Sequence, residues 1–222
     1  MEKNTYPKGK FIVFEGMDGS GKDTQVAKIS ERLHDNCIPH DCTFEPSDSP
    51  VGKLIRDILE KKYTINTVSL ELLFMADRIN HTSNINDSSI LKSLNEGVHV
   101  LCNRYYLSGI TYGGTYAKHL FQKFQSYLIK PDLTIYLDLE PEISLQRINQ
   151  NRDNNDIYEN IDKLKDVRNK FITYIEELKF FNNENIITID ASKDIDTITD
   201  EIFYYIMQTI KGEEYHVHTK NE

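Results

Sequence analysis

The segment Phe11-Ile12-Val13-Phe14-Glu15-Gly16-Met17-Asp18-Gly19-Ser20-Gly21-Lys22-Asp23-Thr24 decides the fold of this chain. Its first four residues are apolar and include a β-branched pair, which predicts a short buried strand of a parallel sheet. Residues 16–22 match the pattern G-x-x-x-x-G-K, and residues 26, 29 and 33 are apolar at helical spacing. A strand, a glycine-rich loop and a helix in this order predict a phosphate-binding loop, more strongly than a turn without a ligand.

Two side chains define what this loop can hold. Lys22 can reach the β and γ phosphates of a nucleotide as a mobile point charge. Asp23 stands where Ser or Thr usually contacts Mg²⁺, and Thr24 is the nearest replacement hydroxyl. The Asp23 carboxylate therefore either contacts the metal, directly or through water, or caps the first helical turn.

The composition bounds the class of protein. A chain of 222 residues with 39% apolar residues is long enough for one well-buried α/β domain, expected over residues 1–210. The formal net charge of -9 opposes a general nucleic-acid-binding role. Residues 211–222 lack periodicity, which predicts a flexible tail.

The chain shows neither a long apolar run nor a signal-peptide pattern. No run approaches the ~20 residues that span a bilayer, and residues 1–10 lack a hydrophobic segment. The chain has three cysteines, an odd and sparse set that fits a protein of a reducing compartment. We expect them to be packed or exposed thiols and not metal ligands. We therefore expect a cytoplasmic protein without a membrane partner.

Four further apolar runs, at 40–44, 98–102, 133–139 and 186–189, alternate with helical patterns. Together with the first strand they predict a five-stranded parallel sheet covered by helices on both faces. We expect the helical apolar positions to form core, and they are 51, 54, 55, 58 and 59; 70, 73, 74 and 79; 161, 164, 171, 175 and 178; and 195, 198, 202 and 206. The polar segment 146–157 carries Arg147 and Arg152, and it predicts a mobile lid rather than an ordinary solvated loop.

Six motifs in this order resemble those of thymidylate kinases, over nearly the whole chain from Phe11 to about Ile210. The motifs are F-E-G-x-D-G-S-G-K (14–22), E-P-S-D-S-P-V-G-K-L-I-R (45–56), L-L-F-M-A-D-R-I-N-H (72–81), N-R-Y-Y-L-S-G (103–109), P-D-L-T-I-Y-L-D-L (131–139) and I-D-A-S-K (189–193). The second and third resemble archaeal members in particular. The resemblance implies a three-layer phosphate-loop kinase fold with a short lid at about 147–158, and a homodimer.

The activity implied by the resemblance is transfer of the γ-phosphoryl group of ATP, with Mg²⁺, to dTMP, giving dTDP and ADP. The implied ATP-binding residues are Gly16, Met17, Asp18, Gly19, Ser20, Gly21, Lys22, Asp23, Thr24, Ala191, Ser192 and Lys193. The implied catalytic cations are Lys22, Arg104, Arg147 and Arg152. The implied metal contacts are Asp23, and Asp18 through water.

The resemblance also implies an acceptor site. Phe74 would stack on the pyrimidine ring, and Arg78 would donate to its O4 atom, which favours thymine or uracil over cytosine. Arg104 would clamp the acceptor phosphate, and Asp18 would accept from the sugar 3′-hydroxyl and orient Arg104. The remaining implied substrate-binding residues are Glu45, Asn103, Ser108, Gly109, Tyr112, Tyr158 and Glu159.

The chain departs from the family pattern at Asp23, at Asn103, where Asp is usual, at Phe44, where bacterial members often carry Arg, and at Gly113, where they often carry Gln. These departures leave two alternatives open. One is a kinase for another pyrimidine substrate such as dUMP, a modified deoxyuridylate or a nucleoside. The other is a non-catalytic nucleotide-binding protein. We favour an active enzyme, because an acceptor phosphate is already mostly dianionic at neutral pH and needs no strong base.

Overall fold

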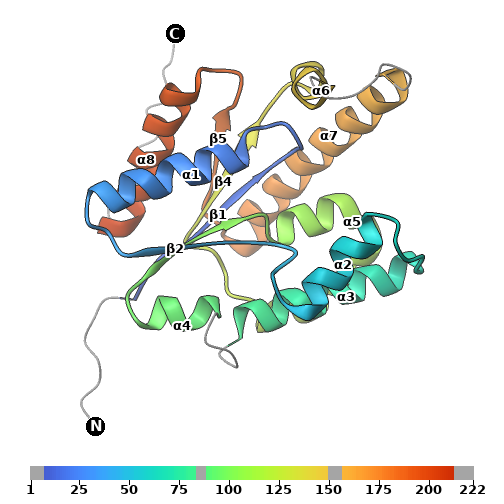
Figure 1. Cartoon of the computed structure of the whole chain (residues 1–222), viewed down its shortest axis with the longest axis horizontal. Coiled ribbons are helices and arrows are strands. Elements are labelled where there is room, and N and C mark those ends of the chain that lie inside the picture. The colour runs from blue at the N-terminus through green and yellow to red at the C-terminus, as the bar shows by residue number, and fades with distance from the viewer. Residues whose placement is uncertain (1–7, 84–88, 150–156, 213–222) are drawn as a thin grey trace.

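The computed structural model describes residues 8–83, 89–149 and 157–212, which form a parallel five-stranded sheet between two layers of helices (Figure 1). The strands are β1 (Phe11–Gly16), β2 (His40–Phe44), β3 (His99–Asn103), β4 (Leu133–Asp138) and β5 (Ile186–Asp190). Their order is β2-β3-β1-β4-β5, and each neighbouring pair is parallel. The predicted α/β fold with five parallel strands is confirmed.

At least one helix lies between each pair of consecutive strands. The helices are α1 (Lys22–Asp35), α2 (Pro50–Leu59), α3 (Thr67–Thr82), α4 (Ile90–Asn95), α5 (Tyr106–Phe124), α6 (Pro141–Asn149), α7 (Ile157–Asn182) and α8 (Ile195–Lys211), with a 3-10 turn η1 (Gln125–Tyr127) after α5. In the described part of the chain, no helix is both long enough and apolar enough to cross a bilayer.

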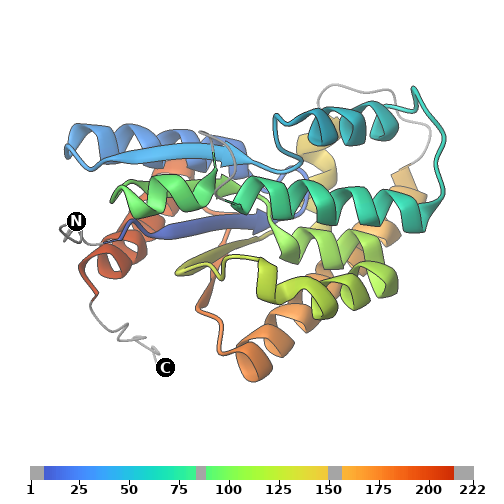
Figure 2. The ribbon, with the colours of Figure 1, turned by 90° about the horizontal axis from the view of Figure 1, so that it is seen from below.

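Alternate residues of β1 enter two separate cores. Phe11 and Val13 pack with residues of α3, α4, α5 and α7, whereas Ile12 and Phe14 pack with residues of α1 and α8. Both faces of the sheet are therefore covered, which explains why its central strands are continuous apolar runs. Figure 2 shows α2 beyond the end of the sheet toward which the β1 arrow points, and α3 extending from beside that end past it.

Three positions predicted as core lie at the surface. Leu54, Leu59 and Ile195 are 40%, 54% and 50% exposed. Helix α2 is peripheral and buries only Gly52 and Ile55, so its stripe is wider than the contact it makes. Ile195 begins α8, one turn before the residues of that helix that reach the sheet.

The predicted lid and tail are partly helical. Residues 147–149 end α6, residues 157–158 begin α7, and residues 150–156 lie outside the described part. Lys211 belongs to α8, which Gly212 closes in a left-handed conformation (φ 72°), and the rest of the predicted tail, residues 213–222, lies outside the described part. The phosphate loop leaves the carboxyl end of β1, the central strand, where ligands bind in open α/β sheets.

Candidate active site

The side chain of Lys22 lies inside the glycine-rich loop. Its ammonium donates to the carbonyl oxygens of Gly16 (3.0 Å) and Met17 (2.6 Å) and lies 3.4 Å from Ser20 Oγ. Burial lowers the pKa of Lys22 to about 8. Gly21, the N-cap of α1, has a φ of 89° and no side chain to satisfy the first turn, so backbone N–H groups there are left for a ligand.

Helix α6 packs directly against this loop. Ser144 Oγ donates to the carbonyl oxygen of Asp18 (2.6 Å), and a Cβ at Gly19 would lie 3.0 Å from the Ser144 carbonyl oxygen. Gly19 has a φ of 76°, so both the space and the backbone conformation require glycine there. Arg147 donates to the carbonyl oxygens of Gly19 (3.3 Å) and Ala191 (3.2 Å). One predicted lid arginine is therefore positioned at the loop.

Asn103 and Asp23 are in contact. Asn103 ends β3, and its Nδ2 donates to Asp23 Oδ1 in the first turn of α1. The side-chain oxygen of Asn103, Oδ1, is buried and has no hydrogen-bond partner among the described residues. Two of the four departures from the family pattern therefore form one polar pair beside the loop.

Arg104 connects the phosphate loop to α5. Its Nη2 pairs with Asp18 Oδ1, and its Nη1 donates to Ser108 Oγ (3.0 Å). The guanidinium also lies over the Tyr112 ring, 5.5 Å from its centroid. Arg104 has a φ of 68°, a strained backbone conformation of the kind that functional sites hold.

Glu15 is the buried residue that fixes this turn. Its Oε1 accepts from the backbone N–H groups of Tyr105 (2.9 Å) and Ser108 (3.1 Å), and its Oε2 accepts from Ser108 Oγ. Burial raises the pKa of Glu15, and the hydrogen bonds from Ser108 oppose that shift. The start of α5 and the side chain of Arg104 are therefore held by a carboxylate on the central strand.

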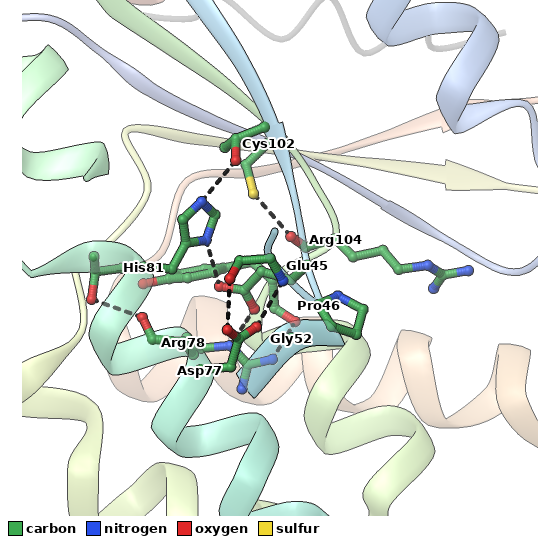
Figure 3. A network of polar contacts seen from close by, with 12 residues as sticks. Glu45, Pro46, Gly52, Asp77, Arg78, His81, Cys102 and Arg104 are labelled. Carbon is green, nitrogen blue, oxygen red and sulfur yellow. Dashed lines mark hydrogen bonds and ion pairs between the residues drawn. The ribbon is translucent and has the colours of Figure 1, made fainter. Parts of the chain in front are cut away.

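Arg78 is held by a buried polar network (Figure 3). Its Nε donates to Glu45 Oε2 (2.6 Å), and its Nη2 donates to the Tyr105 carbonyl oxygen (3.3 Å). His81 lies 3.3 Å from Glu45 Oε1 through Nδ1 and 2.7 Å from Thr43 Oγ1 through Nε2. In Figure 3 the Arg104 side chain points away from this network. Arg78 is thus fixed independently of Arg104.

The segment after β2 is anchored to α3 by Asp77. The Asp77 carboxylate accepts from Ser47 N (2.7 Å), Ser47 Oγ (2.6 Å) and Ser49 Oγ (2.6 Å). A Cβ at Gly52 would lie 1.9 Å from the Ser47 carbonyl oxygen, so α2 begins in close contact with this segment. These contacts hold Glu45 beside Arg78.

Two cavities meet at three shared residues. The first, of about 610 Å³, is lined by the loop, Arg147 and Lys193, and the second, of about 450 Å³, by Phe74, Arg78, Gly109 and Tyr112. Asp18, Glu45 and Arg104 line both cavities. The cavity at the glycine-rich loop and the partly apolar cavity are thus adjacent.

Comparison with known proteins identifies the family of this chain. The family model described as thymidylate kinase matches residues 14–202. The chain belongs to the thymidylate kinase family. The family and the enzyme class predicted from the motifs, an ATP-dependent nucleoside monophosphate kinase, are confirmed.

Curated thymidylate kinases resemble the chain over most of their length. A probable thymidylate kinase of Methanocaldococcus jannaschii is 36% identical over 199 residues, covering 88% of this chain and 95% of the relative. The thymidylate kinase of Ligilactobacillus salivarius is 37% identical over 206 residues, covering 87% and 95%. A probable thymidylate kinase of Methanococcus maripaludis is 37% identical over 206 residues, covering 90% and 96%. Two of the three are archaeal, in line with the wording of the motifs.

The structure brings together most of the residues that the thymidylate kinase motifs indicate. Those lining the two cavities are Asp18, Gly19, Ser20, Gly21, Lys22, Asp23, Thr24, Glu45, Phe74, Arg78, Asn103, Arg104, Ser108, Gly109, Tyr112, Arg147 and Lys193. Both Glu45 oxygens are engaged by Arg78 and His81, so Glu45 supports Arg78.

Other predicted residues lie differently. Gly16 and Met17 face the site through carbonyl oxygens that accept from Lys22. Ala191 is buried, and Ser192 Oγ donates to Asp190 (2.6 Å). Arg152 lies outside the described residues, as do the side chains of Tyr158 and Glu159.

Sequence reasoning missed several residues of this thymidylate kinase site, namely Glu15, Glu71, His81 and Ser144. Glu15 stands in the F-E-G motif, so the sequence marked this residue, but the motif did not indicate what its side chain does. Glu71 and Ser144 had no such signal, because an isolated polar residue in a helix normally faces solvent.

Proposed function

We propose that this chain transfers the γ-phosphoryl group of ATP to dTMP, giving dTDP and ADP. The observation that carries the proposal is the junction of the two cavities at Asp18, Glu45 and Arg104. A donor phosphate held by the loop and an acceptor phosphate held by Arg104 would meet there. Positioning and charge stabilisation supply most of the catalysis of such a transfer.

On the donor side, Lys22 is the central cation. Phosphate oxygens would replace the carbonyl oxygens of Gly16 and Met17 as acceptors for its ammonium. Arg147, already held between Gly19 and Ala191, would face the same phosphates, and Lys193 lines that cavity. We propose that Arg152 joins Arg147 there.

On the acceptor side, Phe74 would stack on the thymine ring and Arg78 would donate to O4. Arg78 is suited to this role because Glu45 fixes its Nε, while a Cβ at Gly109 would lie 3.1 Å from its Nη1 and Nη2. Tyr112, beside Arg104, would crowd a ribose 2′-hydroxyl and so favour a deoxynucleotide.

Mg²⁺ fits the polar pair at Asp23 and Asn103. The buried Asn103 Oδ1 lacks a partner among the described residues, and the Asp23 carboxylate has a second oxygen that its hydrogen bond from Asn103 does not use. Such oxygen donors suit this cation, and Asp18 offers a further carboxylate for its water ligands. When bound, the ion would neutralise charge on the phosphates.

A substrate panel tests the proposal. The protein with ATP and Mg²⁺ is offered dTMP, dUMP, a 5-substituted deoxyuridylate and thymidine, and ADP release is measured by a coupled assay. We expect dTMP to give the highest kcat/KM. A clear preference for thymidine over dTMP would overturn the proposal, and so would ATP binding without dTDP formation at high enzyme concentration.

Two further parts of the proposal rest on the family alone. We propose that the chain is a homodimer and acts in the cytoplasm. Light scattering coupled to gel filtration should give twice the chain mass of 25.9 kDa. A monomeric mass at micromolar concentration would contradict the dimer.

A further inference from the structure

Glu71 is a buried carboxylate that forms no hydrogen bond or ion pair with any residue in the described part of the chain. It lies on α3, is 8% exposed, and lines the second cavity together with Phe74 and Arg78. Burial raises its pKa, and the nearby charge of Arg78 opposes that shift. Its carboxylate oxygens are not among the fully buried unpartnered atoms of the described residues, so they face the cavity, where a ligand can reach them.

The facing helix leaves room for this carboxylate. A Cβ at Gly113 of α5 would lie 2.3 Å from Glu71 Oε2 and 2.6 Å from the Ala117 Cβ. Any side chain at 113 would therefore displace the carboxylate from the cavity wall. The absence of a side chain at Gly113 thus allows Glu71 to place a hydrogen-bond acceptor in a part of the cavity wall where the neighbouring α3 residues Leu70 and Phe74 are apolar.

Glu71 and Arg78 present opposite hydrogen-bonding characters to one cavity. They lie about two turns apart on the same helix, with Phe74 between them. Arg78 can only donate, whereas an ionised Glu71 can only accept. The cavity wall therefore carries a donor and an acceptor on either side of an aromatic ring.

We infer that Glu71 reads the base of the acceptor nucleotide by accepting a hydrogen bond from N3–H of thymine or uracil. This inference rests on the proposed function, in which Arg78 donates to O4. N3–H is adjacent to O4 and is the one N–H donor of the thymine ring. The opposite neighbour of O4 is the C5 methyl edge, and the apolar residues that line the same cavity include Pro46.

The donor and acceptor pair discriminates against cytosine twice. Cytosine carries an amino group in place of O4, which would face the donor Arg78. Its N3 is an unprotonated acceptor, which would face the Glu71 carboxylate. Glu71 is thus a specificity-determining residue that adds to the discrimination by Arg78.

Calorimetric binding of two isosteric ligands tests this role. The ligands are dTMP and 5-methyl-dCMP, which differ only at the two edge positions that Arg78 and Glu71 would contact. The variants are Glu71→Leu, which removes the acceptor, and Glu71→Gln, which keeps an acceptor oxygen without the charge. Glu176→Leu, at an exposed position of α7, is the matched control.

We expect Glu71→Leu to weaken dTMP binding by about 10- to 100-fold, and Glu71→Gln to weaken it less. Binding of 5-methyl-dCMP should not weaken, so the preference for dTMP narrows. Both variants should remain folded, because Glu71→Leu replaces an unpartnered carboxyl group with an apolar side chain.

The outcomes separate this inference from the proposed function. Wild-type protein that does not bind dTMP would overturn both. Wild-type binding that Glu71→Leu leaves unchanged, or an equal loss for both ligands as expected of a purely structural role, would overturn the inference about Glu71 alone.

Discussion

The side-chain amide of Asn103 donates a hydrogen bond to the carboxylate of Asp23, joining the end of β3 to the first turn of α1. The two residues are far apart in sequence, and each departs from the family pattern. A neutral amide can hold a carboxylate in this way, whereas a second carboxylate at 103 would repel it. The pair therefore keeps a single negative charge at this place. Here Asp23 carries the charge, whereas in the family the residue at position 103 usually does.

Exchanging the two residues tests this compensation. We expect Asp23→Ser alone and Asn103→Asp alone each to lower kcat by about tenfold or more. Asp23→Ser removes the single negative charge of the pair, whereas Asn103→Asp places two negative charges in contact. The double variant Asp23→Ser/Asn103→Asp should return to within about threefold of the wild-type kcat, since coupled sites are not additive. A double variant no better than the worse single variant would contradict the compensation.

The depressed pKa of Lys22 predicts a pH dependence of nucleotide binding. Phosphate requires the protonated ammonium, and the free protein loses that proton above a pKa of about 8. Affinity for ADP, measured by calorimetry, should therefore fall as the pH rises from 8 to 9.5, by up to about tenfold per pH unit. The Lys22→Arg variant keeps its positive charge over this pH range. We expect it to bind ADP more weakly than the wild type, with an affinity that does not change with pH. A flat wild-type profile would contradict the shifted pKa.

Removing the Glu15 carboxylate should loosen the start of α5. Glu15→Ala would leave the N–H groups of Tyr105 and Ser108 and the Ser108 hydroxyl without their acceptor. We expect the free energy of unfolding in urea to fall by about 3 kcal/mol and the KM for dTMP to rise. Glu31→Ala, at an exposed position of α1, is the control and should change neither quantity.

Gly52→Ala should disturb the acceptor pocket from a distance. A Cβ there would lie 1.9 Å from the Ser47 carbonyl oxygen, so the segment that carries Glu45 must shift. We expect a loss of about 1–3 kcal/mol in the free energy of unfolding and a raised KM for dTMP, with little change in the KM for ATP. Lys53→Ala, at the exposed neighbouring position, should behave as wild type. Equal effects on both KM values would argue against a local displacement.

The fold was predictable from sequence because a parallel sheet covered on both faces makes its central strands continuous apolar runs. The same reasoning failed at Leu54 and Leu59, where α2 has an apolar stripe but little to pack against. Periodicity records the pattern of a helix, and the depth of burial depends on neighbours that come from elsewhere in the chain.

The site was predictable only where motifs carry it. The loop and Arg104 followed from their motifs, but the contact between Asn103 and Asp23 depends on the register of β3 beside β1. Glu71 was missed because its burial depends on the packing of α5 against α3, which no local sequence pattern indicates. Long-range contacts of this kind have no signature within a single segment.

The two cavities are built from different parts of the chain and share Asp18, Glu45 and Arg104 among the described residues. The phosphate loop and α6 shape one cavity, and α3 with the start of α5 shapes the other. Phe74 and Glu71 line only the second cavity, so they can be varied without changing any residue proposed to hold ATP. This separation lets the range of acceptors be changed independently of the phosphoryl donor.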